Sequence, residues 1–176
     1  MKKALTIIAL VLVISTSVIA GTLAMYTTSI DDLAQGSVVA KAFVMTEGGT
    51  DTFTQNVAIA PGETQDFKFS IKNYDGSIVS ETAMALAIDV DVTAAQGKNL
   101  IAPLKISVED ASGNTVGSVT GSGLIEFDDE FALQAQGQEK TFTAVVTWPG
   151  DGSADIDYAG AEFGTALKVS VTGTQK

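Results

Sequence analysis

From about Gly36 onward, apolar residues alternate with polar or small residues along several stretches of the chain. A period of two places alternate side chains on opposite faces of a β-strand, so this pattern predicts strands with one buried face. The clearest case is Asp66–Lys72, where Phe67, Phe69 and Ile71 share one face. The pattern also predicts strands over 83–92, 104–109, 142–148 and 167–172. Val145 on the second face predicts that the 142–148 strand is more central or more protected than the others.

Weaker alternation predicts further strands over 38–44, 53–59, 115–119 and 130–134. Clusters of Gly, Pro, Asn and Asp, which are typical of turns, separate the predicted strands. They lie at 47–49, 61–63, 73–76, 112–114, 121–123 and 149–152. About eight or nine short strands at this spacing predict an all-β fold, an antiparallel and jelly-roll-like β-sandwich over 36–176.

The first 24 residues have the pattern of a secretory signal peptide. Lys2 and Lys3 precede an apolar run that extends to Ala20, and small residues follow up to Ala24. This order is typical of a cleaved export signal, so we expect a signal peptidase to cut between Ala24 and Met25. The mature protein would then be secreted, with no membrane segment; the alternative is a retained N-terminal anchor.

Charge and length limit the classes of partner. Cleavage would leave 152 of the 176 residues, enough for one domain with a core of its own. All ten basic residues are Lys, and two of them lie in the signal, so eight remain against 21 acidic residues, a formal net charge of −13. Nucleic acid requires a basic surface, so it is excluded as a partner.

The chain contains no His, no Cys and no Arg. Without His, neither a Ser-His-Asp triad nor a His-ligated zinc site can form. A pair of carboxylates remains able to hydrolyse glycosides, but no aromatic residues cluster around such a pair. We therefore expect neither an enzyme nor a bound cofactor, and no disulfide supports the domain.

Acidic clusters are the remaining candidates for a metal site. Asp151, Asp155 and Asp157 follow Pro149-Gly150, but their spacing differs from that of an EF-hand loop. Solubilising charge is the preferred interpretation here and at two other clusters, with weak calcium binding as the alternative. Those clusters are Asp128-Asp129-Glu130 and Asp31-Asp32. Trp148, the single tryptophan, ends an inward-facing row and is predicted to lie in the core.

The segment from residue 25 to 35 differs from the rest of the chain. Its apolar residues are too sparse for a helix, it is rich in Thr, and it begins at the terminus that cleavage creates. Edge strands of a sandwich have unpaired backbone groups that can accept a strand from another copy of the chain. Two interpretations remain: an arm donated to a neighbour, or an arm folded back or disordered.

Several segments resemble the TasA and camelysin family, in the same order and spacing over nearly the whole chain. They are the signal end Gly21–Tyr26, the short arm, the segment Ala60–Asn73 followed by Met84-Ala85-Leu86, and the C-terminal stretch from Tyr158 to Gln175. The resemblance implies a jelly-roll subunit of extracellular biofilm-matrix fibres, exported with a dedicated signal peptidase. It also implies a head-to-tail homopolymer in which each N-terminal arm is donated to the next subunit, and related subunits form archaeal bundling pili. Carried onto this chain, the resemblance implies a donor strand with a continuation toward Val44 as an alternative. The donor residues would be Met25, Tyr26, Thr27, Thr28, Ser29, Ile30, Asp31, Asp32, Leu33 and Ala34.

Two rival functions accompany this resemblance. Camelysins have been classed as metalloproteases, but a chain without His cannot form the His-Glu-x-x-His motif that holds catalytic zinc. A non-polymerising surface or matrix module, which binds polysaccharide or another matrix protein, is the second alternative. It predicts a mature protein that stays monomeric at high concentration.

Overall fold

The computed structural model describes residues 41–150 and 155–176. The predicted signal peptide (1–24), its cleavage site at Ala24–Met25 and the predicted donor strand (25–34) lie outside the described residues. No helix in the described part of the chain is long and apolar enough to cross a membrane.

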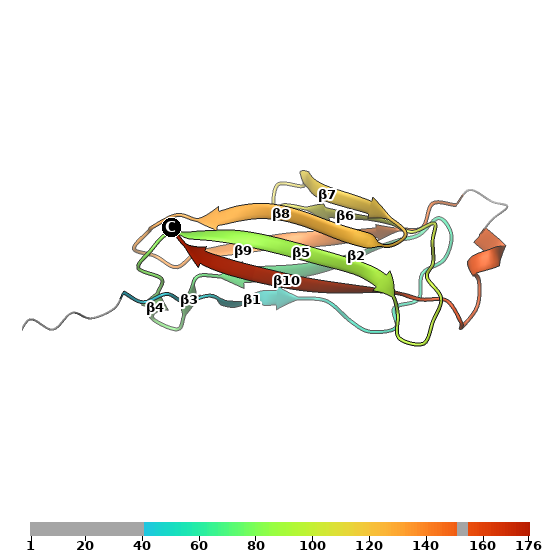
Figure 1. Ribbon diagram of the computed structural model, residues 1–176, viewed down its shortest axis with the longest axis horizontal. Helices are drawn as coiled ribbons and strands as arrows, with labels where there is room; N and C mark the ends of the chain where they lie inside the picture. The colour runs from blue at the N-terminus through green and yellow to red at the C-terminus, as the bar shows by residue number, and fades with distance from the viewer. Residues whose placement is uncertain (1–40, 151–154) are drawn as a thin grey trace, which may run out of the picture. The chain divides into compact units, whose positions relative to one another are not determined.

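Two antiparallel sheets face each other across one apolar core, as Figure 1 shows. The first has the strand order β1-β2-β9-β6-β7, the second the order β10-β5-β8, and a small β3-β4 hairpin is separate from both. The predicted all-β sandwich is therefore confirmed. The strands are β1 (Thr46–Asp51), β2 (Thr64–Lys72), β3 (Tyr74–Asp75), β4 (Ile78–Val79), β5 (Met84–Ala94), β6 (Lys105–Glu109), β7 (Thr115–Thr120), β8 (Gly123–Phe131), β9 (Glu139–Thr147) and β10 (Thr165–Gln175).

Strand β5 contributes the largest continuous part of the core. Every second residue from Met84 to Val92 points inward and is at most 1 % exposed. Strand β9 lies between β2 and β6 in the other sheet, as predicted for the 142–148 segment, and supplies Phe142 to the core. The ring of Phe142 lies 5.4 Å from Phe69 of its own sheet and 5.2 Å from Phe127 of the opposite sheet, measured between centroids. This aromatic contact joins the two layers.

The prediction of a turn at Glu47-Gly48-Gly49 was wrong, because these residues belong to β1. Gly48 approaches β2 so closely that a Cβ atom there would lie 2.5 Å from the Cβ of Ser70. The glycine thus permits strand pairing where we had expected it to end a strand.

One predicted strand is absent, and the described part of another is irregular. Residues 53–59 form no strand, because Asn56 adopts a left-handed backbone with φ of 59° that interrupts extended structure. Residues 41–44 of the predicted 38–44 strand are also irregular, although the Ala42 carbonyl accepts a hydrogen bond of 2.9 Å from the Glu81 amide. Residues 38–40 lie outside the described part.

The predicted strand over 130–134 was misplaced. Strand β8 begins earlier, at Gly123, and ends at Phe131, which is fully buried. Its alternation is obscured by Leu124, which is exposed, and by Asp129, which points toward the other sheet and pairs with Lys140 at 2.6 Å. The strands predicted at 66–72, 83–92, 104–109, 115–119 and 167–172 are confirmed with small changes of boundary.

Glu139 links β1 to β2 through hydrogen bonds, and its contribution to the free energy of unfolding should depend on pH. Its carboxylate accepts hydrogen bonds from the Ser70 hydroxyl at 2.6 Å and from the Gly49 amide at 3.0 Å, and these bonds lower the pKa of Glu139. A lowered pKa stabilises the fold above the pKa of the unfolded chain, and this contribution is lost as the pH falls. Because Glu139 is exposed and Gln keeps one acceptor oxygen, we expect Glu139→Gln to lower the free energy of unfolding by up to about 1 kcal/mol at pH 7.

Urea unfolding of the wild type and of Glu139→Gln at pH 7 and at pH 3 checks this expectation. The difference between the two proteins should shrink at pH 3, because the contribution of a carboxylate with a lowered pKa decreases once the pH falls below the pKa of the unfolded chain. A difference that is equal at both pH values would contradict the assigned role.

Candidate functional site: the open edge of β10

Strand β10 forms one edge of the three-stranded sheet. All eleven of its residues pair with β5, from Thr165 opposite Ala94 to Gln175 opposite Met84. Its other side has no strand partner among residues 41–150 and 155–176. Long unpaired edges of this kind are templates for strand addition.

The hydrogen bonds at the two ends of β10 establish which backbone groups face the open side. Ala95 donates to Gly164 at 2.9 Å and Lys176 donates to Ala83 at 3.0 Å, so the even-numbered residues of β10 direct their backbone groups toward β5. The odd-numbered residues, including Leu167, Val169 and Val171, therefore direct their amides and carbonyls away from β5. A strand that adds at this edge would pair with these residues.

The same odd-numbered residues point their side chains toward the core. Leu167, Val169 and Val171 are only half-buried, whereas their partners on β5, Val92, Val90 and Ile88, are fully buried. The core is thus less well covered along β10 than along β5. An apolar side chain added beside β10 would bury more of this surface, at about 25 cal/mol per Å² of apolar area.

The facing sheet is also incomplete at one edge. Strand β1 pairs only with the Phe69–Lys72 half of β2. Beyond it, Thr52 makes two hydrogen bonds with Lys68: its amide donates to the Lys68 carbonyl at 2.9 Å, and its hydroxyl accepts from the Lys68 amide at 2.7 Å. Phe53 follows and lies 5.4 Å from Phe67 between ring centroids; both rings are half-buried. Near the C-terminal end of β10, Gly173 lies close to Met45 and Met84. A Cβ atom at residue 173 would lie 2.7 Å from the sulfur of Met84 and 2.9 Å from that of Met45.

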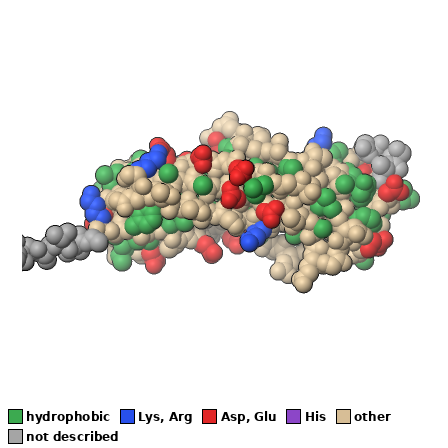
Figure 2. All heavy atoms as spheres, viewed as in Figure 1, with side chains coloured by type: hydrophobic (Ala, Val, Ile, Leu, Met, Phe, Trp, Pro, Cys, Tyr) green, Lys and Arg blue, Asp and Glu red, His purple; other side chains and the backbone are tan. Residues whose placement is uncertain are grey.

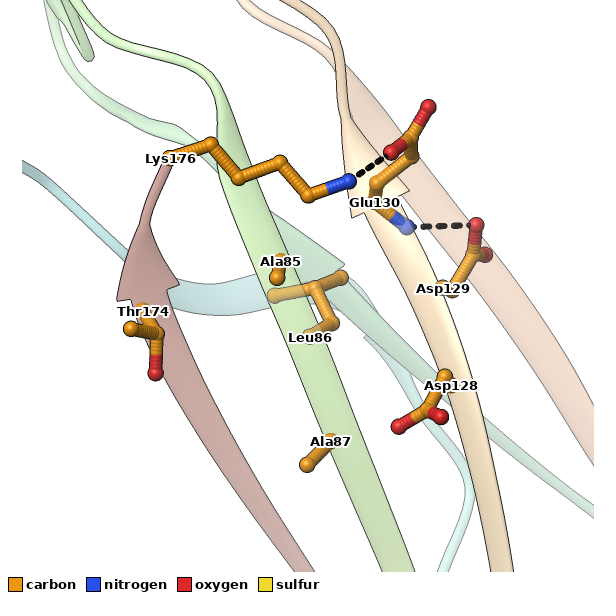
Figure 3. Close-up of a pocket in the computed structure, with 8 residues that line it drawn as sticks. All are labelled: Ala85, Leu86, Ala87, Asp128, Asp129, Glu130, Thr174 and Lys176. Carbon is orange, nitrogen blue, oxygen red and sulfur yellow. Dashed lines mark hydrogen bonds and ion pairs between the residues drawn. The ribbon is translucent and has the colours of Figure 1, made fainter.

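The outer face of the three-stranded sheet is acidic. Asp89 of β5 lies directly opposite Glu126 of β8, and Ala87 lies opposite Asp128. Figure 2 shows acidic side chains over the middle of this face. A shallow hollow of about 510 Å³ on this face has the small side chains of β5 as its floor (Figure 3).

The 128–130 cluster is divided by the pleat of β8. Asp128 points outward, Asp129 pairs with Lys140, and Glu130 pairs with Lys176, whose side chain reaches across β5 (Figure 3). The hydrogen bond and charge of Lys176 lower the pKa of Glu130. Two of these three carboxylates therefore take part in ion pairs, in addition to any effect on solubility.

The 151–157 cluster does not form a common ligand set in the described part of the chain. Asp151 lies outside it, and Asp157 is exposed on a short 3₁₀ helix, η1 (Asp155–Tyr158). Asp155 is 7 % exposed and accepts a hydrogen bond of 2.8 Å from the indole nitrogen of Trp148. Trp148 is itself 3 % exposed, so its predicted place in the core is confirmed.

Residues 41–150 and 155–176 contain no group of three or more acidic, His or Cys side chains arranged to hold a metal ion. No family model matches this chain. A search of curated proteins likewise gives no match.

Sequence reasoning did not identify the β10 edge. The alternation over 167–172 predicted a half-buried strand, but alternation carries no information about which neighbour a strand lacks. The partial exposure of Leu167, Val169 and Val171 arises because β10 lies at the edge of its sheet, which depends on strand order.

Proposed function

We propose that this protein is a secreted structural subunit that polymerises into extracellular fibres. Each subunit donates residues 25–34 of its N-terminal arm to the β10 edge of the next copy. Affinity comes from backbone hydrogen bonds along the edge and from apolar arm residues such as Ile30 and Leu33, which cover the half-buried side chains of β10. The mechanism requires no catalytic residue, metal or cofactor.

The observation that carries this proposal is the open edge of β10. It is eleven residues long, and its outward-facing backbone groups have no strand partner among residues 41–150 and 155–176. These groups belong to residues with inward apolar side chains that are incompletely covered. The predicted donor has ten residues, so its length matches this edge. The resemblance to the TasA and camelysin family supports the same reading and extends it to a role in the biofilm matrix.

Removal of residues 25–34 tests the proposal. We expect the truncated mature protein to remain a folded monomer, because the first strand of the described sandwich begins at Thr46, and to form no fibres in negative-stain electron microscopy. The intact mature protein, with its first residue determined by N-terminal sequencing, is the control. Fibres of unchanged abundance after truncation would refute donation by the arm, and an intact protein that stays monomeric would favour the surface module.

A further inference from the structure

Large apolar side chains are exposed at both ends of the sandwich. At one end, Ile78 on the β3-β4 hairpin is 56 % exposed and Leu133 in the β8–β9 loop is 61 % exposed. At the other end, Ile156 on η1 is 78 % exposed. Strand β9 separates the two ends, because the β8–β9 loop precedes Glu139 and η1 follows Thr147. Nine residues of strand span about 30 Å, so the two ends cannot meet within one molecule; Figure 1 shows the hairpin and η1 at opposite ends.

The hairpin end contains a pocket of about 470 Å³. It is lined by Ser77, Val79 and Glu81 on one side and by Leu133, Gln134 and Ala135 on the other. We call this the terminal pocket. Its two walls are joined by Asn73, which is 1 % exposed: its side-chain oxygen accepts a hydrogen bond of 2.7 Å from the Gln138 amide, and its carbonyl accepts one of 2.9 Å from Ser80. The terminal pocket is therefore preformed.

Ile156 is also held in place. The neighbouring Asp155 is buried and bound to Trp148, which anchors η1 to the end of β9. An exposed isoleucine on an anchored turn loses little conformational freedom when it is buried by a partner, so such a residue is suited to an interface.

The chain enters the sandwich beside the terminal pocket. Ala42 exchanges two hydrogen bonds with Glu81, which lines the pocket: the Ala42 amide donates to the Glu81 carboxylate at 3.0 Å, and the Glu81 amide donates to the Ala42 carbonyl at 2.9 Å. If residues 25–34 pair with another copy, only residues 35–40 join that copy to this end. Six residues reach at most about 20 Å, so the accepting copy must lie against the terminal-pocket end.

The direction of β10 relative to the donated strand determines which end of the accepting copy lies against the terminal-pocket end of the donating copy. Strand β10 runs from the η1 end at Thr165 to the terminal-pocket end at Gln175. If the donor enters at the η1 end of the acceptor, it runs antiparallel to β10, which is the more stable pairing. If two terminal-pocket ends faced each other, pairing would be parallel and the two arms would exchange within a closed dimer.

We propose that Ile156 of the accepting subunit inserts into the terminal pocket of the donating subunit. This end-to-end contact rests on the proposed function and gives the fibre its polarity. It buries Ile156 against Leu133 and Val79 of the neighbouring copy.

Because the chain has no native cysteine, introduced pairs test the contact directly. Mature protein with both Leu133→Cys and Ile156→Cys is assembled, oxidised and separated on a non-reducing denaturing gel. We expect a ladder of covalent oligomers that thiol reduction abolishes. The matched control combines Leu133→Cys with Glu126→Cys, since Glu126 is exposed on the outer face in the middle of β8, opposite Asp89, and it should give no ladder.

Each outcome separates the contact from the proposed function. Fibres in the microscope without a cross-linked ladder would overturn the end contact and leave arm donation intact. Covalent dimers from Leu133→Cys alone, with no longer species from the pair, would show that terminal-pocket ends face each other, and would overturn the polarity. Absence of fibres in the wild type would overturn both proposals.

Discussion

A single lysine in place of Val169 should abolish fibres and leave the subunit folded. Val169 is half-buried at the middle of β10, and its backbone groups face the open edge. In the free subunit the long lysine side chain can reach solvent along that edge. A strand added beside it would enclose the ammonium group without a partner, at a cost of several kcal/mol. Inward-pointing charges protect natural edge strands in this way.

Ser170→Lys is the matched control for Val169→Lys. Ser170 is exposed on the outer face, and its backbone groups face Asp89 of β5 rather than the open edge. Fibre abundance is measured by negative-stain electron microscopy and by sedimentation, and folding by circular dichroism. We expect a loss of fibres of at least about tenfold for Val169→Lys, which corresponds to 1.4 kcal/mol or more, and near-wild-type fibres for Ser170→Lys. Equal fibre yields from the two variants would exclude β10 as the acceptor.

Phe142→Ala should cause a large loss of stability. Phe142 is 3 % exposed and its ring contacts Phe69 and Phe127, so it packs against both sheets. Truncation of a buried phenylalanine costs about 3–5 kcal/mol, because the cavity collapses only in part. For a domain of this size, each kcal/mol lowers the melting temperature by about 2–4 °C, so we expect a decrease of about 10 °C.

Phe43→Ala provides the comparison for Phe142→Ala. Phe43 is 43 % exposed and lies outside the strands, so its truncation should change the free energy of unfolding by less than about 0.5 kcal/mol. Urea and thermal unfolding followed by circular dichroism measure both variants. A loss below about 1 kcal/mol for Phe142→Ala would contradict its role in joining the sheets.

The sequence predicted strands reliably where one face is apolar and the other polar. Strands β2, β5 and β10 have this pattern, and β9 was recognised as central from Val145. Strand β1 was missed because Gly48 and Gly49 resemble a turn, whereas Gly48 allows close approach to Ser70. Most of β8 was missed because the exposed Leu124 and the inward Asp129 interrupt its alternation. An ion pair with Lys140 compensates the burial of the Asp129 charge.

The candidate site was less accessible to sequence reasoning. The β10 edge depends on which strands are neighbours, and pairing between Thr165 and Ala94 joins residues far apart in the chain. The terminal pocket likewise depends on Asn73, whose contacts with Ser80 and Gln138 connect two loops. Neither arrangement leaves a local signal, because both arise from packing of distant segments. The absence of His, in contrast, was readable at once and argued against zinc-based proteolysis.

The hydrogen bond between Trp148 and Asp155 gives the protein a built-in optical reporter. Trp148 is the sole tryptophan, so all indole fluorescence originates at the end of β9 that carries η1. Its emission is sensitive to the polarity around the ring, and Ile156 is only one residue from the carboxylate that binds the indole nitrogen. Assembly of subunits through this end would therefore be visible as a spectral change in unlabelled protein, in real time.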